Sequence, residues 1–426
     1  MSTSPFLTRS PHERFYHPEL DVLRFFSFFF IFIHHSMPHD PAFYTAMGVP
    51  SILAAAIAAI GAAGAFGVQL FFLLSAYLVT ELLIRERALR GRVDLKAFFV
   101  RRILRIWPLY FAFLAFAWAM QYFIPGQHIG WRAELAFIFL GGNWWIVFVG
   151  FPSSVIFPLW CISIEEQFYL FWPATMRKLS TRGLLIAAAC ILAVASLTRC
   201  YLGFRHTWES RVWCNTFAQL DAIGFGIILA VLLAGHAPRL TRLHRAALFV
   251  GGFVCLFLAG SYFRIKFDPV TTSRLLLGYP VAALGAVSLF LATLRPSPEQ
   301  DLSGALKNEA GALKNDAGGP FKPSSGLSGV KQTLPPDPNP GHSRLQDAFV
   351  YLGRISYGLY TFHIVGLMTS DYAVAHQDSS LGRYLFRNAV ALAVTIVLAS
   401  VSYRWLESPF LSFKQRFTHV LSRPGG

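Results

Sequence analysis

Long apolar stretches, separated by short polar segments, recur along almost the whole chain. Ten of these stretches are long enough to cross the hydrocarbon core of a bilayer as helices. They lie at residues 20–37, 65–84, 98–124, 158–176, 183–202, 216–234, 246–262, 274–294, 349–370 and 385–406. The pattern therefore predicts an all-α protein, a polytopic transmembrane helical bundle of about ten spans.

A further apolar stretch at 133–150 is ambiguous. Gly141, Gly142 and Asn143 interrupt it, and Pro152 follows it. Glycine and proline both disfavour a continuous helix. This composition suits a re-entrant or in-plane element, and the span count rises to eleven only if the stretch crosses the membrane.

Composition and charge agree with a membrane protein. The chain is 54% hydrophobic and only 14% charged, and its formal net charge is +15. Basic residues concentrate in 85–105, 177–182 and 239–245, and again after Arg404. These segments share one side of the membrane if the N-terminus is cytoplasmic, as the positive-inside rule predicts. We therefore expect the lipid bilayer, and not nucleic acid, as the partner of this charge. The expected location is a bacterial-type inner (plasma) membrane, crossed several times, with both termini cytoplasmic.

One segment, 295–345, breaks the apolar pattern. It is rich in Gly, Pro, Ser, Lys and Asn, and it has too little apolar surface to fold. We therefore expect a disordered cytoplasmic linker there. The predicted domains are a cytoplasmic N-terminal tail at 1–19, a first transmembrane part at 20–294, the linker, the last two spans at 346–410 and a cytoplasmic C-terminal tail at 411–426.

The first span carries ionisable side chains that a bilayer makes costly. Arg24 opens a phenylalanine-rich run, and His35 follows eleven residues later. Eleven helical residues advance about 16 Å and return to nearly the same face, so the two side chains share one stripe. Asp21 lies beside that stripe, whereas His34 points about 80° away. Intramembrane ionisable groups indicate function, although a snorkelling arginine and a packed histidine are the structural alternative.

A second polar cluster begins the third span. Arg102 and Arg105 are three residues apart on one helix face, and Arg101 lies within reach of Arg105. Several guanidinium groups on one stripe suit a phosphate-bearing ligand, because each can bond two oxygens at once. Pro108 favours a kink that frees backbone carbonyls. Ordinary positive-inside anchoring is the alternative interpretation.

Two further clusters lie in later spans. Glu165, Glu166 and Tyr169 stand in an apolar stretch of the fourth predicted span, where carboxylates must face protein, water or partner charges. A structural ion pair would also explain Glu166. His363 follows several hydroxyl residues in the ninth predicted span, and taken alone it is best explained by helix packing.

The five cysteines show no metal-ligand spacing. Cys200 and Cys214 flank a predicted external loop, so an oxidised pair is one possibility, and buried free thiols are the other. We find no zinc motif, no glycine-rich phosphate loop and no serine-hydrolase elbow, and we expect no metal.

At these residues the chain resembles the acyltransferase 3 family of integral membrane acyltransferases, which includes O-antigen, exopolysaccharide and peptidoglycan O-acetylases. The spacing of Arg24 and His35 is similar to its arginine, ten residues, histidine pattern, and Arg102 and Arg105 resemble its paired-arginine motif. The resemblance extends to four further segments: 67–75, 163–169, 356–363 and 407–409. Gln69 stands where an acidic residue is common, and Ala76-Tyr77 replaces a usual glycine-aromatic pair.

The resemblance implies a membrane O-acyltransferase that uses cytoplasmic acyl-CoA, most simply acetyl-CoA, as donor substrate, with no permanently bound cofactor. The implied acceptor is a hydroxyl of a glycan or glycolipid. Since coenzyme A carries several phosphates, Arg102 and Arg105, with Arg101 assisting, are the expected donor site.

His35 is the expected catalytic residue. It acts either as the general base or as a transient acyl carrier, and the sequence does not separate these routes. Asp21 and Arg24 orient it or stabilise developing charge. Glu165, Glu166, Tyr169 and His363 are assigned to acceptor or supporting roles.

The alternative function is a transporter or flippase for lipid-linked glycans, which also needs charged groups in a multi-span bundle.

Overall fold

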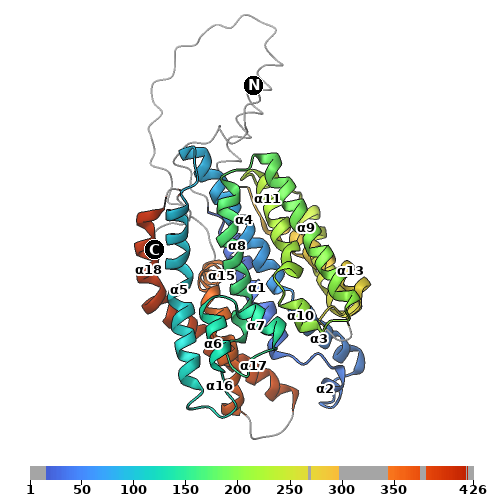
Figure 1. Ribbon diagram of the computed structural model, residues 1–426. Coiled ribbons are helices and arrows are strands. Elements are labelled where there is room, and N and C mark those ends of the chain that lie inside the picture. The colour runs from blue at the N-terminus through green and yellow to red at the C-terminus, as the bar shows by residue number, and fades with distance from the viewer. Residues whose placement is uncertain (1–15, 267–269, 297–343, 375–379, 419, 421–426) are drawn as a thin grey trace, which may run out of the picture.

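The apolar stretches fold into helices that run side by side along one axis of the molecule, as the computed structural model shows (Figure 1). The structure describes residues 16–266, 270–296, 344–374, 380–418 and 420, and it contains no β-strand within these ranges. The predicted linker and N-terminal tail lie almost entirely outside the described residues. The all-helical prediction is confirmed for the part of the chain that is described.

The α-helices follow the order α1 Pro18–Ser36, α2 Pro41–Thr45, α3 Ser51–Gly64, α4 Gly67–Arg90, α5 Leu95–Met120, α6 Trp131–Ile138, α7 Gly142–Phe148, α8 Trp160–Met176, α9 Thr181–Phe204, α10 Glu209–Trp213, α11 Leu220–Leu233, α12 Arg242–Phe257, α13 Thr272–Thr293, α15 Arg344–Arg354, α16 Ser356–Val374, α17 Leu381–Ser402 and α18 Ser408–Lys414. A π-helical turn continues α12, and another joins α17 to α18.

Helical segments long and apolar enough to cross a membrane confirm a membrane protein. The described residues contain six: Ser51–Arg90, Leu95–Met120, Thr181–Phe204, Arg242–Tyr262, Thr272–Thr293 and Leu381–Lys414. Helices α1, α8, α11 and α16 do not meet the same criteria of length, hydropathy and charge. The count of ten crossings and the orientation of the termini therefore stay predictions.

Four of these segments present most of their apolar surface outward, among them Leu381–Lys414, of whose apolar window 17% is buried. Only 22% of the apolar window in α9, and 22% of that in Arg242–Tyr262, is buried within the protein. Their remaining side chains include exposed residues such as Leu197 and Phe253. A soluble protein does not leave so much contiguous apolar surface uncovered, whereas a bilayer covers it.

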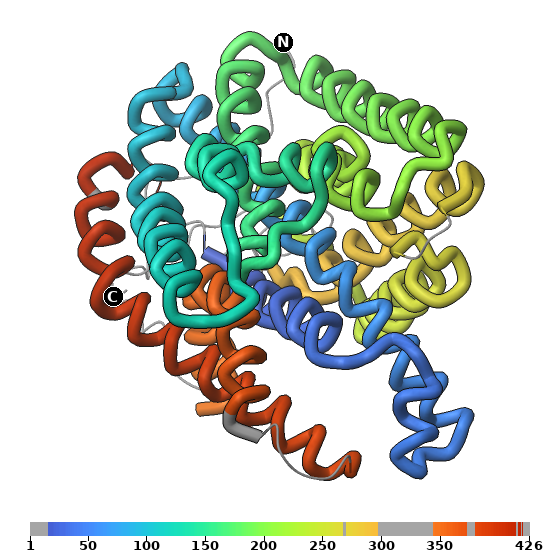
Figure 2. The backbone as a smooth tube through the Cα atoms, turned by 60° about the horizontal axis from the view of Figure 1, so that its bottom comes forward, coloured from blue at the N-terminus to red at the C-terminus, as the bar shows by residue number. Residues whose placement is uncertain are grey.

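Helix α1 occupies the interior of the bundle. It packs against α3 and α4, and also against α15 and α16. Figure 2, seen from the end that carries α2 and α3, shows α17 and α18 (red) along one edge of the bundle and α9 (green) at the opposite edge. Pro18 begins α1 at a position where its missing N–H costs nothing, and Glu19 and Asp21 lie in the first turn, where acidic groups favour the helix dipole.

The predicted ninth span is divided into two helices. α15 ends at Arg354 and α16 begins at Ser356, so 349–370 is not one continuous helix. Gly353 in α15 packs against the backbone of α1: an added Cβ would lie 1.8 Å from the carbonyl oxygen of Asp21. This close packing holds α15 against α1, and the helix is interrupted at Ile355 before α16 begins.

Two other boundaries differ from the sequence prediction, and the ambiguous stretch does not form one spanning helix. α3 precedes the predicted second span. The ambiguous stretch 133–150 forms the short helices α6 and α7, each of which is far too short to cross a bilayer. α18 extends beyond residue 410, the predicted end of the last span, because Pro409 lies in its first turn, where proline is tolerated.

One buried ion pair stabilises the helices away from the candidate site. Arg199 of α9 is fully buried, and its guanidinium pairs with both carboxylate oxygens of Asp221 in α11. The same guanidinium donates to the carbonyl of Ala218 at 2.9 Å. Neither residue lines the cavities described below. This pair is therefore structural.

We expect Arg199→Leu to lower the free energy of unfolding in detergent by about 3 to 5 kcal/mol, because it leaves the Asp221 carboxylate buried without its partner. The measurement is thermal and denaturant unfolding followed by fluorescence. Adding Asp221→Leu to that variant should restore most of the loss. Arg205→Leu, at an exposed position, is the matched control. Equal stability of Arg199→Leu and the unmodified protein would contradict the structural role.

Candidate active site

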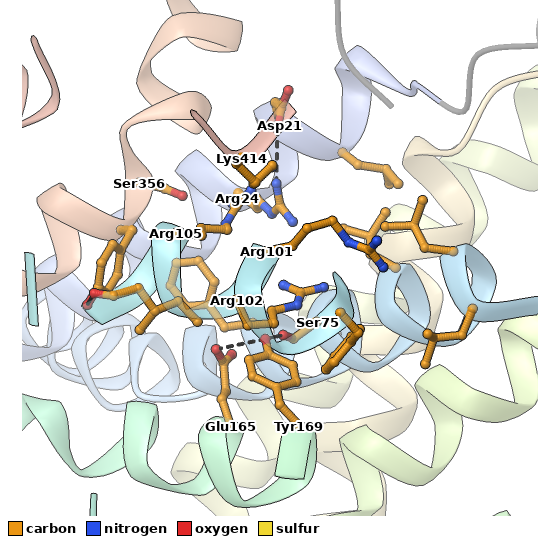
Figure 3. A pocket seen from close by; sticks show the side chains of 18 of the residues that line it. Asp21, Arg24, Ser75, Arg101, Arg102, Arg105, Glu165, Tyr169, Ser356 and Lys414 are labelled. Carbon is orange, nitrogen blue, oxygen red and sulfur yellow. Dashed lines mark hydrogen bonds and ion pairs between the residues drawn. The ribbon is translucent and has the colours of Figure 1, made fainter. Parts of the chain in front are cut away.

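Charged side chains from five helices line one cavity inside the bundle, here called the arginine cavity. Figure 3 shows Arg24, Arg105 and Lys414 converging in it from α1, α5 and α18. Its described lining includes five Arg and Lys side chains but only three carboxylates. The cations are Arg24, Arg101, Arg102, Arg105 and Lys414, and the carboxylates are Asp21, Glu86 and Glu165. The cavity therefore has an excess of positive charge and suits an anion.

Asp21 and Arg24 meet at the start of α1. The Arg24 guanidinium donates to a carboxylate oxygen of Asp21 at 3.2 Å, as their spacing of three residues allows. The Asp21 side chain is 3% exposed and that of Arg24 is 17% exposed. The burial of the carboxylate holds the arginine in place while the guanidinium still reaches the cavity.

Arg102 lies against the face of an aromatic ring. Its guanidinium carbon is 4.6 Å from the centre of the Tyr169 ring and 5.5 Å from that of Phe98. The Tyr169 hydroxyl donates to Glu165 at 3.3 Å and also bonds to the Ser75 hydroxyl. Stacking leaves the edge of a guanidinium free to donate to oxygen atoms. Glu165 and Tyr169 therefore orient Arg102 within the cavity (Figure 3).

Arg101 has a different environment from Arg102. It pairs with Glu86 at 2.8 Å and donates to the main-chain oxygen of Phe417 at 2.7 Å. Glu86 is buried and also accepts from the Asp94 backbone at 2.9 Å. Arg101 therefore anchors the end of the described chain to α4 and α5, which its prediction as a donor ligand did not include.

We expect Arg101→Gln to speed tryptic cleavage after Arg416 by about tenfold, because the charge-assisted bond to the Phe417 carbonyl is lost together with the Glu86 pair that holds the guanidinium in place. The measurement is timed proteolysis of the folded protein with mass spectrometry of the released fragment. Arg92→Gln, an exposed position between α4 and α5, is the control. An unchanged cleavage rate in Arg101→Gln would show that these bonds do not hold the segment.

Glu166 lies outside the described lining of the arginine cavity. One of its carboxylate oxygens accepts from the indole nitrogen of Trp107 at 3.3 Å, and the other is buried without a hydrogen bond. The two adjacent glutamates therefore have different surroundings: Glu165 faces the cations and Glu166 faces α5.

Helix α5 continues through Pro108, and the carbonyl of Ile106 accepts from the Tyr357 hydroxyl at 3.0 Å.

His35 does not line the arginine cavity. It is exposed near the opposite end of α1, about 16 Å along the axis from Arg24, in a second cavity here called the histidine cavity. Phe43, Tyr384 and Arg387 also line this second cavity. The structure thus brings Arg24 together with the third-span arginines but leaves His35 apart from them.

His363 lies between the two cavities. Its ring centre is 5.1 Å from that of His35 and 5.5 Å from that of Tyr360, a residue that lines the arginine cavity. The His363 side chain is fully buried, its Nδ1 lies 2.6 Å from the Tyr360 carbonyl oxygen, and its Nε2 has no hydrogen-bond partner. The packing interpretation of His363 alone does not account for that nitrogen.

Several lining residues were not singled out as site residues from sequence. Lys414 lay in the predicted C-terminal tail. Ser75 and Ser356 belonged to segments that resemble the family, but no role was predicted for either of them. Tyr384 and Arg387 reach the histidine cavity through the packing of α17 against the end of α1, which local sequence does not predict. The one clue in the sequence is that Arg387 is a charged residue inside an apolar stretch.

Metal and disulfide chemistry have little support in the described residues. No group of three or more His, Cys, Asp or Glu side chains in those ranges is arranged to hold a metal ion. All five cysteines are free thiols, so the alternative of an oxidised Cys200–Cys214 pair is not adopted.

Comparison with known proteins identifies relatives. The family model described as an acyltransferase domain, acyltransferase 3, matches residues 17–404. The peptidoglycan O-acetyltransferase OatA of Listeria monocytogenes is 26% identical over 369 residues, which cover 81% of this chain and 51% of that protein. A Staphylococcus aureus (strain COL) protein, provisionally named an O-acetyltransferase, is 25% identical over 371 residues, or 82% of this chain and 52% of its own.

A third relative is YrhL of Bacillus subtilis (strain 168), provisionally named a peptidoglycan O-acetyltransferase. It is 25% identical over 385 residues, which cover 84% of this chain and 53% of YrhL. The chain spans about half the length of these relatives. No solved structure matches it.

Proposed function

The chain belongs to the acyltransferase 3 family, and from that premise we propose that it transfers an acyl group from acyl-CoA to a hydroxyl of a cell-surface or exported glycan. Acetyl is the simplest group, since relatives are named O-acetyltransferases. The observation that carries the proposal is the arginine cavity: it gathers Arg24, Arg102, Arg105 and Lys414 around one space.

The donor assignment rests on charge and geometry. Coenzyme A carries a pyrophosphate and a 3′-phosphate, and guanidinium forks bind such groups at two oxygens at once. Arg102 supports this role best, because its guanidinium lies over the rings of Phe98 and Tyr169, a contact that leaves its N–H edge to a ligand. Arg24, Arg105 and Lys414 complete the site, while Arg101 contributes charge from its pair with Glu86.

The acyl group then has to reach His35. With its phosphates held by the arginines, the donor would extend its pantetheine arm along the cavity toward Tyr360, whose ring neighbours His363. On the far side of the fully buried His363 lies His35, so the reaction requires the side chains that separate the two cavities to open a passage for the acyl group. This arrangement suits an enzyme that takes its donor at one end of the bundle and meets its acceptor at the other.

The reaction itself needs a base. The acceptor oxygen attacks the thioester carbonyl carbon, the carbon–sulfur bond breaks, and coenzyme A leaves as a thiolate. His35 takes the hydroxyl proton, which finally protonates the thiolate. In the alternative route His35 first carries the acyl group and a second step passes it to the acceptor. Arg24, held in place by Asp21 in the donor cavity, would stabilise negative charge on the donor side.

The glycan acceptor is supported by the names of the relatives, two of which are called peptidoglycan O-acetyltransferases. The histidine cavity offers groups that suit a sugar, because the rings of Phe43 and Tyr384 line it beside Arg387. Aromatic faces pack against the apolar faces of sugar rings, and guanidinium groups bond to their oxygens.

The test uses purified protein in lipid nanodiscs with radiolabelled acetyl-CoA, followed by mass spectrometry of cell-surface glycans from cells with and without the gene. We expect release of coenzyme A that depends on an added glycan, and loss of an acetyl mass from the glycans of cells without the gene. Movement of a lipid-linked glycan across the bilayer without donor consumption would instead support the flippase.

A further inference from the structure

We infer that His363 is a positioning residue for His35, a buried imidazole that fixes the tautomer and orientation of the catalytic ring. The inference rests on the proposed function, since it assigns His363 a part in the same reaction. It begins from the buried nitrogen of His363 that has no partner, and from the short separation of the two rings.

The hydrogen bond that the Nδ1 of His363 makes determines which nitrogen of its ring carries the proton. The Nδ1 of His363 lies 2.6 Å from the carbonyl oxygen of Tyr360. A carbonyl oxygen only accepts, so Nδ1 must be the donor and must carry hydrogen. In a neutral imidazole the other nitrogen is then an acceptor. His363 thus presents the lone pair of Nε2 inside the protein.

A buried acceptor without a donor is costly, so a nearby donor is expected. The ring of His35 is the polar ring nearest to His363, with centres 5.1 Å apart and an interplanar angle of 40°. The other rings near His363 are those of Phe28, at 6.4 Å, and Tyr360, whose hydroxyl already donates to the carbonyl of Pro158 at 2.7 Å. Among the rings that the described part of the chain places beside His363, that of His35 is therefore the one with an N–H not already assigned to another acceptor.

A hydrogen bond from His35 to Nε2 of His363 would have two consequences. It fixes one nitrogen of His35 as the donor, so the other nitrogen is left as the base that faces the histidine cavity. It also stabilises His35 after it takes a proton, because an N–H of imidazolium donates more strongly. A buried acceptor that orients a catalytic histidine in this way is the arrangement found in catalytic triads.

His34 provides an internal comparison. Its ring centre is also 5.1 Å from that of His35. Like His363, it has its Nδ1 beside a carbonyl oxygen, that of Gly61 at 3.1 Å, but its side chain is only partly buried and its ring stacks on His39 at 4.5 Å. Other groups that carry or can gain positive charge near His35 are His39, four residues further along the chain, Lys266, in the segment before α13, and Arg387 of α17, which lines the same cavity. These groups stay unchanged when His363 is replaced.

The experiment compares His363→Leu and His363→Gln in nanodiscs, with kcat and KM for acetyl-CoA measured from pH 5 to 9. We expect His363→Leu to lower kcat by about tenfold to hundredfold and leave KM for the donor within twofold. The acidic limb of the kcat profile should move down by roughly 0.5 to 1 pH unit, because protonated His35 loses its acceptor. His363→Gln, whose amide oxygen can accept, should recover part of both losses.

Two controls separate this role from simple packing. Thr361→Val changes a buried polar residue on the same helix, and it should leave the pH profile where it is. His34→Leu removes a neighbour that can gain positive charge, so it should not move the acidic midpoint down, whatever its total activity. A His363→Leu profile with the unmodified midpoint, or an equal shift in His34→Leu, would overturn the inference. Absence of any acyl transfer by the unmodified protein would instead remove the proposed function.

Discussion

His35→Ala is expected to lower acyl transfer to the glycan by about 10²- to 10⁴-fold, the usual contribution of a positioned acid–base group. Donor binding should change less than twofold, because His35 lies outside the arginine cavity that is proposed to hold acyl-CoA. The measurement is single-turnover acetyl transfer in nanodiscs, together with equilibrium binding of acetyl-CoA. A large loss of acetyl transfer with almost unchanged binding of acetyl-CoA is expected because the two groups line different cavities.

The control for that experiment is His206→Asn. His206 is an exposed histidine after α9 with a positive φ of 47°, a backbone conformation that asparagine tolerates. It should retain full transfer. Correctly inserted His35→Ala that still transfers acetyl at the unmodified rate would remove His35 from catalysis. Label retained on the unmodified protein without acceptor, and absent from His35→Ala, would favour the acyl-carrier route over the general-base route.

Periodicity and hydropathy predicted the fold class, because burial in lipid leaves a helix as the only way to satisfy each backbone group locally. Boundaries were less predictable where tertiary contacts decide them. α15 and α16 are separate because Gly353 allows α15 to lie against the α1 backbone at Asp21. A contact between residues more than 300 positions apart leaves no mark in local sequence.

The candidate site was likewise predictable where the geometry of a single helix decides it, and not where packing between helices does. Helix geometry predicts that Asp21 lies beside Arg24, and that Arg102 and Arg105 share a face. It also predicts that Arg24 and His35 share a stripe, but it does not say whether one cavity spans that stripe. In the structure it does not: the interior between them is filled by side chains that include Phe28 and His363. Cavities depend on how all neighbouring helices pack, so their extent could not be inferred from α1 alone.

Sequence reasoning also treated the three arginines at 101, 102 and 105 as equivalent. They differ because of distant partners. Glu86 and the Phe417 carbonyl occupy the Arg101 guanidinium, while Tyr169 supports that of Arg102. The C-terminal segment that supplies one of those partners lay in a predicted tail. This difference determines which arginine should matter most for the donor.

Arg102→Ala is accordingly expected to weaken acetyl-CoA binding by about tenfold to hundredfold, the cost of losing one charged hydrogen-bonding group on a phosphate. Arg102→Lys should recover only part of the loss, because an ammonium keeps the charge but loses both the planar fork and the stacking on Tyr169. The measurement is calorimetric or fluorescence binding of acetyl-CoA to protein in nanodiscs, at two salt concentrations.

Arg92→Gln is the matched control, since it removes one positive charge from an exposed position between the same two helices. It should weaken binding less than twofold, and that small effect should vanish at high salt. Binding of dephospho-coenzyme A refines the assignment: the variant that no longer distinguishes it from coenzyme A has lost the contact to the 3′-phosphate. If Arg102→Ala and Arg92→Gln behave alike, the arginine cavity acts only through general charge and is not a donor site.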